Sequence, residues 1–264
     1  MEFIDSHAHP HFAELAADWP GVMARAEEAG VKRMIAVGTT LEDSQRAINF
    51  AKAKNGVWAA AGVHPHEAKK TLASKDFEAN FKKLLDLSSN TENKLMAIGE
   101  IGLDYYKNHS PKEDQLKLLR RQIEIGLSYR LPFIFHVRDA FSDFWQVFDD
   151  YGGIKGVIHS FSSGRKQLDV ALSRGLFVGL NGIMTFTRDQ AQLEAAGRVP
   201  LDRLLLETDA PFLIPAPERG EVCEPRHVRI VAEFLASLRG EALADLAAQT
   251  TANAVSLFDL KDKS

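Results

Sequence analysis

Histidines and carboxylates recur along this sequence directly after short apolar runs. They are Asp5, His7, His9, His64, Glu100, His136, His159, Glu207 and Asp209. Imidazoles and carboxylates are ligands that Zn²⁺, Mn²⁺ and Fe²⁺ accept, and one carboxylate can bridge two ions. If the fold brings these side chains together, their types predict a site for divalent metal ions.

The apolar runs themselves predict eight strands. Each run has four to seven residues, which is short for a buried helix, and enrichment in Ile, Val and Phe is typical of strands buried on both faces. The runs are residues 3–6, 33–38, 57–63, 96–100, 133–136, 156–160, 176–180 and 204–207.

Longer amphipathic stretches between these runs predict helices. Residues 20–29 end at Gly30, a C-cap signal, and residues 113–129 place apolar side chains on one face, namely Leu116, Leu119, Ile123 and Leu127. The other predicted helices are 41–54, 140–151, 165–174, 188–197, 225–238 and 241–258. The alternation favours an α/β fold, a single (β/α)₈ TIM barrel, over an open doubly wound sheet.

Length and composition agree with one such domain over residues 1–264. The chain has 264 residues, 45% of them hydrophobic and 26% charged, and a (β/α)₈ barrel typically needs about 250 residues. The single cysteine, Cys223, excludes an intramolecular disulfide and fits a reducing cytosol. Neither a secretory leader pattern nor an apolar run near the ~18 residues of a membrane span is found, so we expect a cytoplasmic protein without a membrane or an obligate protein partner.

In a barrel, the carboxyl ends of all strands meet on one face, where catalytic residues lie. Residues i and i+2 of a strand point the same way, so His7 and His9 can bind one ion together. Glu100 can reach two ions, and His136 and His159, on neighbouring strands, can complete the second site. Convergence of such distant positions on one pocket is the strongest prediction that the residues alone support.

The expected chemistry is hydrolysis without a serine or cysteine nucleophile. Two metal ions about 3.5–4 Å apart clamp the attacking and leaving oxygens of an ester, and a metal lowers the pKa of its water to roughly 7. Asp209 can bind the first ion and accept a proton from the attacking water. The formal charge of −4 gives no global attraction to a polyphosphate, so metals and local cations must supply the positive field.

Taken singly, each of these residues has a simpler interpretation. The His7–His9 pair can be a surface pair, His159 a hydrogen-bonded structural residue, and Glu100 a turn carboxylate between glycines. A buried polar group without a partner costs about 1–3 kcal/mol. Because so many lie at the ends of apolar runs, a shared ligand explains the set better than separate structural roles.

Several segments together resemble the TatD family of metal-dependent deoxyribonucleases. The similarity spans nearly the whole chain in the family's order. The segments are IDSHAH (4–9), GVHPH (62–66), AIGEIGLDYY (97–106), IFHVRDA (134–140), VIHSFS (157–162) and LETDAPFL (206–213), followed by RG (219–220) and EP (224–225).

The resemblance implies an amidohydrolase-like barrel with two divalent ions (Zn, Mg or Mn) and phosphodiester hydrolysis, often exonucleolytic. One ion would be held by His7, His9, Glu100 and Asp209, and the other by Glu100, His136 and His159. His64 matches a family histidine near the substrate phosphate. The chain departs from the family pattern at Cys223, where Asn is usual, and at Asn181, where Ser is more frequent; both affect substrate contacts rather than metal ligands.

Residues near the predicted ligands are candidates for binding substrate. Arg138 either contacts a phosphate or pairs with Asp139 or another loop carboxylate, and Arg219 is a second candidate phosphate contact. Tyr105, Tyr106 and Phe161 either stack on bases or pack under loops. His11 and His66 are expected to be solvated loop residues. Glu207 is expected to orient a ligand or a loop, and Glu224 to tether the loop after the last strand.

Three functions remain open. The first is a nuclease on DNA, for example a 3′–5′ exonuclease on single-stranded ends. Scattered cations near the ligands, among them Lys107 and Arg165, favour this function. A dense basic stripe, expected of an avid DNA binder, is not found. The second is a small-molecule ester, amide or phosphoester hydrolase with the same metals. The third, a non-catalytic metal-binding protein, is disfavoured by the complete ligand set.

Overall fold

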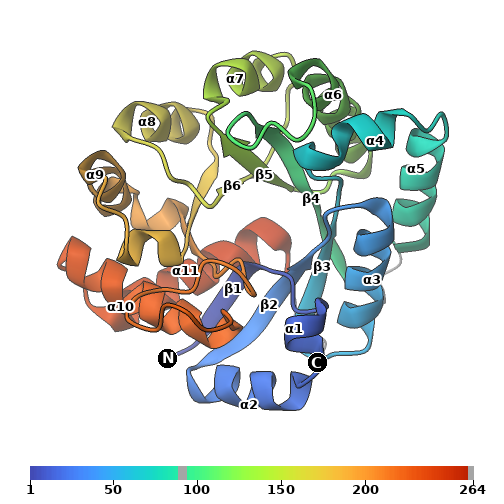
Figure 1. The fold of residues 1–264 in the computed structure, drawn as a ribbon. Helices are drawn as coiled ribbons and strands as arrows, with labels where there is room; N and C mark the ends of the chain where they lie inside the picture. The colour runs from blue at the N-terminus through green and yellow to red at the C-terminus, as the bar shows by residue number, and fades with distance from the viewer. Residues whose placement is uncertain (89–93, 261–264) are drawn as a thin grey trace. The chain divides into compact units, whose positions relative to one another are not determined.

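The computed structural model describes residues 1–88 and 94–260, in which strands and helices alternate along the chain (Figure 1). The eight strands follow one another in the sheet in the order β1-β2-β3-β4-β5-β6-β7-β8, which is the strand order of a (β/α)₈ barrel. The strands are β1 Phe3–Ala8, β2 Val31–Val37, β3 Val57–Ala61, β4 Leu95–Asp104, β5 Phe133–Arg138, β6 Gly156–His159, β7 Phe177–Leu180 and β8 Leu204–Leu206. The predicted fold class and all eight predicted strands are confirmed.

The helices include every predicted one, with ends shifted by a few residues. They are α2 Trp19–Glu28, α3 Leu41–Lys52, α6 Lys112–Tyr129, α7 Phe141–Asp149, α8 Arg165–Ser173, α9 Gln190–Arg198, α10 Val228–Arg239 and α11 Leu243–Phe258. Three helices are absent from the prediction: α1 Ala13–Ala16, α4 Ala68–Leu72 and α5 Phe77–Ser88. No helix of the described ranges has the length and apolar character to cross a membrane.

The residue contacts group into two compact units. The terminal unit comprises residues 1–36 and 159–264, and the central unit comprises residues 37–158. In the terminal unit, β7 pairs with β8 in parallel register and β1 with β2. The Ser6 hydroxyl donates to the Leu206 carbonyl oxygen at 2.9 Å, so β8 lies beside β1 although the two strands are about as far apart in the sequence as the fold allows.

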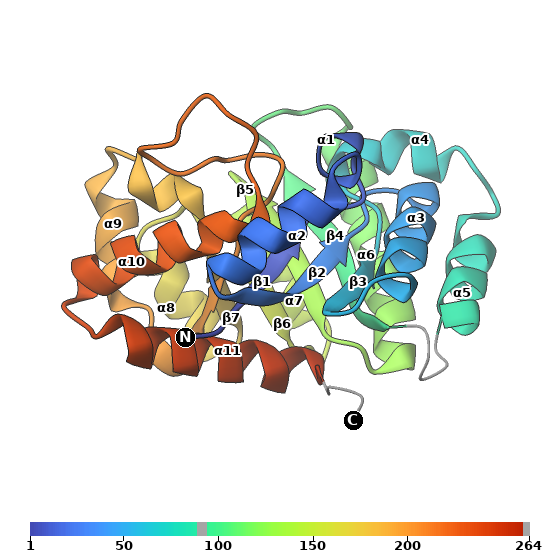
Figure 2. The same ribbon diagram turned by 90° about the horizontal axis from the view of Figure 1, so that it is seen from below.

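Helices α10 and α11 lie side by side in the terminal unit (Figure 2). The side chains of Val231 and Leu235 on α10, and of Leu246 and Phe258 on α11, are almost fully buried. Helix α10 ends at Gly240, whose φ of 66° is the left-handed conformation that glycine adopts without strain. These helices cover the sheet and leave its carboxyl edge to the loops.

In the central unit, β4 pairs in parallel register with β3 and β5. Gly102 makes the β4–β5 approach possible, because a Cβ there would lie 1.8 Å from the His136 carbonyl oxygen. The buried face of α6 differs from the predicted one: Leu119 and Ile123 are buried as expected, but Leu116 and Leu127 are only half-buried. The helix buries Gln115 and Gln122 instead, for a reason that the site explains.

Candidate metal centre

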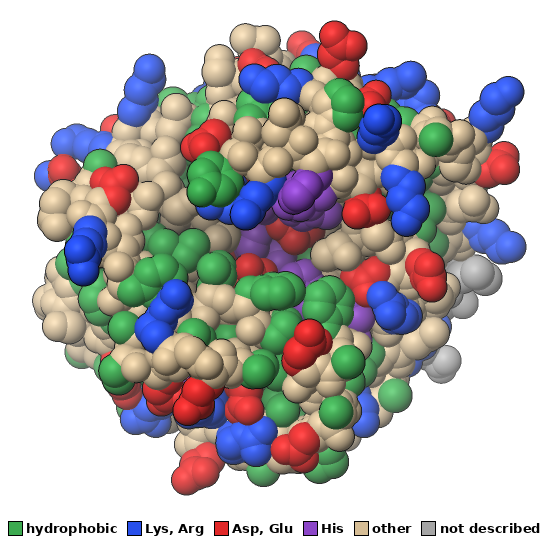
Figure 3. Space-filling view, viewed as in Figure 1, with side chains coloured by type: hydrophobic (Ala, Val, Ile, Leu, Met, Phe, Trp, Pro, Cys, Tyr) green, Lys and Arg blue, Asp and Glu red, His purple; other side chains and the backbone are tan. Residues whose placement is uncertain are grey.

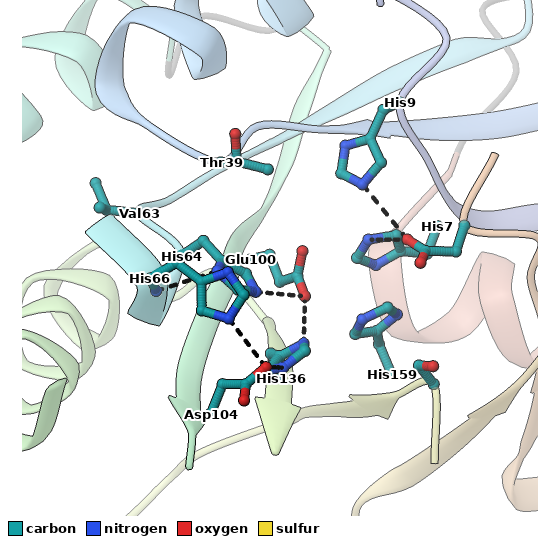
Figure 4. A network of polar contacts seen from close by, with 12 residues as sticks. His7, His9, Thr39, Val63, His64, His66, Glu100, Asp104, His136 and His159 are labelled. Atoms are coloured by element: carbon teal, nitrogen blue, oxygen red, sulfur yellow. Dashed lines mark hydrogen bonds and ion pairs between the residues drawn. The ribbon is translucent and has the colours of Figure 1, made fainter. Parts of the chain in front are cut away.

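In the terminal unit, four predicted metal ligands converge. His7 and His9 direct their Nε2 atoms to the same oxygen of Asp209, at 3.5 and 3.4 Å. The rings of His7 and His159 stack with centroids 3.7 Å apart. Donor atoms of His7, His159 and Asp209 all lie within 4.8 Å of one another, so the geometry brings strand β1, the end of β6 and the loop after β8 to one cation-sized space (Figure 4).

The backbone fixes Asp209 against β1. The Asp209 N–H donates to the His7 carbonyl at 2.8 Å, and the His9 N–H donates to the Ala210 carbonyl at 2.7 Å. Asp209 itself has a φ of 64°, a left-handed conformation that costs a non-glycine residue about 1–3 kcal/mol. The two backbone hydrogen bonds offset this cost, which indicates that the loop is built to turn the Asp209 carboxylate back toward the histidines.

Asp5, on β1, forms hydrogen bonds with the same loop. Its buried carboxylate accepts hydrogen bonds from the Thr208 N–H at 3.0 Å and the Thr208 hydroxyl at 2.5 Å. It also accepts one from the His7 N–H at 3.3 Å. Asp5 therefore couples the positions of His7 and Asp209 without being placed among the ligands.

Glu207 contacts both a predicted ligand, His159, and the loop that follows it. Its fully buried carboxylate oxygen Oε1 lies 3.3 Å from His159 Nδ1 and accepts a hydrogen bond from the Ser160 N–H. Gly179 leaves room for it, because a Cβ there would lie 2.3 Å from Glu207 Oε2. A carboxylate behind a ligating histidine is the usual arrangement that fixes ring orientation at metal sites.

The electrostatic surroundings keep Asp209 ionised. Burial by itself would raise the pKa of Asp209, but the hydrogen bond from His9 and the charges of His159 and His7 outweigh it, so that pKa lies below the ordinary range. An ionised carboxylate beside imidazoles can bind a cation or accept a proton.

In the central unit, a second set of donors converges from the turn after β3 and from strands β4 and β5. His136 Nδ1 lies 2.7 Å from Glu100 Oε1, and His64 Nε2 lies 3.6 Å from the same oxygen. Donor atoms of these three residues lie within 4.8 Å of one another. Figure 4 shows the side chains of His64, Glu100 and His136 directed toward one another.

Asp104 is a buried carboxylate of this cluster that the sequence analysis did not identify. Its buried carboxylate oxygen Oδ2 lies 3.0 Å from both His136 Nε2 and His66 Nε2. Burial opposes ionisation, but the hydrogen bonds from His136 and His66 prevail, so the pKa of Asp104 is far below its usual range. The signal was its place on β4, four residues after Glu100, where an even spacing directs both side chains to one face.

His66 is therefore not the solvated loop residue expected from the sequence. It is half-buried and bound to Asp104, because the turn after β3 folds back over the end of β4. His64 Nδ1 accepts a hydrogen bond from the His66 N–H at 3.2 Å, which leaves the ring proton on Nε2, facing Glu100. Burial lowers the pKa of His64 to about 3, so it is a neutral hydrogen-bond donor at neutral pH.

The two buried glutamines of α6 hold the strand ends that carry these residues. Gln122 accepts from the Val63 N–H at 2.7 Å and donates to the Val63 carbonyl at 3.0 Å, directly before His64. Gln115 makes the same pair of bonds with the backbone of Asp104, at 2.8 and 3.1 Å. Their backbone contacts explain why α6 buries amides in place of leucines.

The predicted substrate-binding arginines are both exposed and stacked on aromatic rings. The Arg138 guanidinium lies 3.9 Å from the ring centroid of Tyr106, and that of Arg219 lies 3.9 Å from Phe186. Arg219 also donates to the Ile214 carbonyl at 3.0 Å. Stacking orients each guanidinium while its edge can still meet an anion.

The other candidates divide between packing and exposure. Phe161 is buried and packs in the interior, and Tyr105 donates its hydroxyl to Asp143 at 2.7 Å, whereas Tyr106 is 58% exposed. Glu224 accepts two hydrogen bonds from Arg25 at 2.8 Å and so tethers the loop after β8, as predicted. Cys223 is buried, and burial raises its pKa, which opposes a nucleophilic role.

On the face drawn in Figure 3, histidine side chains are visible, and Lys and Arg side chains are dispersed among Asp and Glu. The donor set in each unit consists of imidazole nitrogens and carboxylate oxygens that are mostly buried. Such mixed nitrogen and oxygen sets fit Zn²⁺, Mn²⁺ and Fe²⁺. The residues present therefore suit a divalent metal.

Comparison with known proteins agrees with this geometry. The family model of the TatD related DNases matches residues 4–259. The 3′-5′ ssDNA/RNA exonuclease TatD of Salmonella typhimurium is 34% identical over 94% of this chain and 95% of its own length. The metal-dependent hydrolase YcfH of Escherichia coli is 34% identical, covering 98% of this chain and 97% of that protein.

A solved structure gives the same result for the fold. The crystal structure of YjjV, a TatD homologue from Escherichia coli, superposes with a TM-score of 0.90 at 29% identity and covers 98% of each chain. A TatD family hydrolase from Entamoeba histolytica, 24% identical, has a TM-score of 0.88 over 98% of each chain. The family resemblance expected from the sequence is thus confirmed.

Proposed function

The chain belongs to the TatD related DNase family and is a metal-dependent hydrolase; on that premise we propose that it hydrolyses phosphodiester bonds of DNA, as a 3′–5′ exonuclease acting on single-stranded ends. The observation that carries the proposal is the convergence of imidazoles and carboxylates at strand ends in both units. The activity in the Salmonella protein's name supports the choice of substrate.

We assign the metal ligands from the family pattern and the two clusters. His7, His9, Glu100 and Asp209 bind one divalent ion, and Glu100, His136 and His159 bind the other. Support for the first set comes from the approach of His7 and His9 to Asp209. Support for the second comes from the 2.7 Å contact of His136 with Glu100 and the orientation of His159 by Glu207. Zn²⁺, Mn²⁺ and Mg²⁺ are the candidate ions.

The ions would polarise the phosphate and lower the pKa of water toward neutrality. Asp209, ionised and held by the backbone of His7, accepts the proton of the attacking water. Asp104 accepts the ring proton of His136 at Nε2, which leaves Nδ1 facing Glu100, so that both could share one ion. The protein thus supplies the base and fixes the orientation of the histidines before substrate binds.

Three side chains are proposed to bind the substrate phosphate. His64 offers its neutral Nε2–H beside Glu100, which can donate to a phosphate oxygen without adding a charge that would repel the metals. Arg138 and Arg219, oriented by Tyr106 and Phe186, offer planar guanidinium groups suited to phosphate.

The alternative is a small-molecule ester, amide or phosphoester hydrolase that uses the same site. The formal charge of −4 and the dispersed cations of Figure 3 favour a substrate smaller than a nucleic acid strand. One barrel and one metal site can serve many substrates, and the relative YcfH is named for metal-dependent hydrolysis alone.

An assay on labelled single-stranded DNA with Mg²⁺, Mn²⁺ or Zn²⁺ separates the two functions. We expect stepwise shortening from the 3′ end that requires the metal and is lost on addition of a chelator. Cleavage of a small ester or amide by the same preparation, with the DNA left intact, would establish the alternative. Blocking the 3′ hydroxyl with a phosphate or a dye provides the control for direction.

A further inference from the structure

A cavity of about 710 Å³, which we call the groove, opens in the central unit beside His66. Its lining includes His66, Glu67, Lys69, Lys70, His109 and Ser110. The volume lies within the range of about 300–1,000 Å³ that is usual for ligand pockets. None of the predicted substrate contacts contributes to this lining, so the cavity is separate from the phosphate contacts assigned above.

Its two walls are held at a fixed separation by Ser110. One wall is the short turn after β3 with α4, and the other is the loop between β4 and α6, which lie side by side in Figures 1 and 2. The buried Ser110 hydroxyl donates to the His66 carbonyl at 2.6 Å and accepts from the Lys69 N–H at 3.1 Å. Gln115 donates to the Ser110 carbonyl at 2.8 Å. The groove is therefore part of the same hydrogen-bonded frame that positions Asp104.

The lining has the chemistry of a nucleotide site. Two lysines face it against the single carboxylate of Glu67, which lies 4.0 Å from the Lys70 ammonium. The rings of His66 and His109 meet edge to face with centroids 4.6 Å apart. Ammonium groups attract phosphate as point charges, and an imidazole offers both a ring face for a base or sugar and a hydrogen-bond donor.

His66 joins the groove to the ligand cluster of the central unit. His66 lines the groove and contacts Asp104 at 3.0 Å, Asp104 contacts His136 at 3.0 Å, and the ring centroids of His64 and His66 are 4.2 Å apart. A strand whose scissile phosphate lies near His64 can extend into the groove with its next nucleotide.

We propose that this groove binds the nucleotide adjacent to the scissile phosphodiester, with Lys69 and Lys70 on its phosphate and His66 and His109 beside its base or sugar. The inference rests on the proposed nuclease function and deepens it: the chain recognises a strand of at least two linked nucleotides. Single phosphodiesters that end at the scissile group lie outside the groove.

The test is the double variant Lys69→Ala/Lys70→Ala, with Lys82→Ala/Lys83→Ala on α5 as the matched control. All four lysines are exposed on helices of the same unit, where alanine favours the helix. The substrates are a single-stranded oligonucleotide and bis(p-nitrophenyl) phosphate, a diester too short to reach the groove. Oligonucleotide affinity is measured separately, by anisotropy in an Asp209→Asn background that removes cleavage.

For Lys69→Ala/Lys70→Ala we expect a loss of about tenfold in kcat/KM on the oligonucleotide, mostly through KM. Its salt dependence should become shallower by about 0.7 per lost phosphate contact. Hydrolysis of the short diester should stay within about twofold, and the control should match the parent on both substrates. Equal losses on both substrates, or no loss of oligonucleotide affinity, would contradict the proposal that the groove binds a nucleotide. If the parent chain hydrolyses the diester but leaves DNA intact while the anisotropy difference persists, the proposed nuclease function fails and the groove stands.

Discussion

The two ligand clusters hold their histidines in different ways. In the central unit, His136 has a carboxylate at each ring nitrogen, Glu100 at 2.7 Å and Asp104 at 3.0 Å. In the terminal unit, His7 and His9 approach one oxygen of Asp209 at 3.5 and 3.4 Å, and His7 stacks on His159. Hydrogen bonds thus shape the central cluster before a cation binds, whereas the terminal cluster gathers several imidazoles around one carboxylate and depends more on the cation.

The largest expected effect on activity is that of replacing Asp209, the carboxylate of the cluster in the terminal unit. Asp209→Asn removes both the proposed base and a metal ligand, so kcat on single-stranded DNA should fall by roughly 10²–10⁴-fold, the usual contribution of a general base. Steady-state kinetics with saturating metal measures it, and circular dichroism checks the fold. Activity within tenfold of the parent would remove Asp209 from its proposed role.

Next in size are the residues behind the ligands, one in each unit. Asp104→Asn weakens the hold on His136, and Glu207→Gln weakens the hold on His159, so each should lose about 10–100-fold in metal affinity or activity. Isothermal titration with Mn²⁺ gives the affinities. Asp143→Asn, which alters a carboxylate that binds Tyr105 outside the ligand clusters, is the control and should bind metal like the parent.

The fall in thermal stability on removal of the metal also compares the two clusters. A ligand present at 100 times its Kd stabilises the folded state by about 2.7 kcal/mol, so chelation should lower Tm by roughly 5–10 °C for a chain of this size. The shift should shrink in His7→Ala/His9→Ala more than in Asp104→Asn if the terminal cluster depends more on its cation. Equal shifts in the two variants would contradict the contrast between the units.

A smaller effect is expected from the Gln122 amide, which binds the backbone of Val63 at the end of β3. Gln122→Leu leaves the buried N–H and carbonyl of Val63 without the amide that binds them, which should cost about 1–3 kcal/mol in the free energy of unfolding. Urea denaturation measures this cost. Gln146→Leu, an exposed change on α7, should stay near the parent value, and a similar loss in both variants would show that Gln122 holds nothing specific.

The sequence allowed the strands and the main ligands to be predicted because both leave a local signal. Apolar runs buried on two faces stand out, and polar residues at their ends, such as His136, break the pattern visibly. Asp104 escaped because the predicted run ended at Glu100, whereas β4 continues to Asp104. Gln115 and Gln122 escaped for a different reason: helical periodicity counts apolar residues, so a buried amide on α6 looks like a solvated one.

Of the missed helices, α4 left no local signal, whereas α5 did. Helix α4 has only five residues, too few for a periodic pattern, and its role as a groove wall follows from Ser110, which is distant in the sequence. In α5, Phe77, Phe81 and Leu85 do recur at helical spacing and are buried. What lies beyond any local pattern is which side chains meet, as His66 shows in reaching Asp104.

The most direct test of the account is the metal content of His136→Ala beside that of the parent chain, measured by inductively coupled plasma mass spectrometry after loading with Mn²⁺ and desalting. The account predicts about two ions per parent chain, the number of a two-metal hydrolase, and about one in the variant, with DNA cleavage lost in parallel. Equal metal content and an unchanged cleavage rate in His136→Ala would contradict the two-ion assignment.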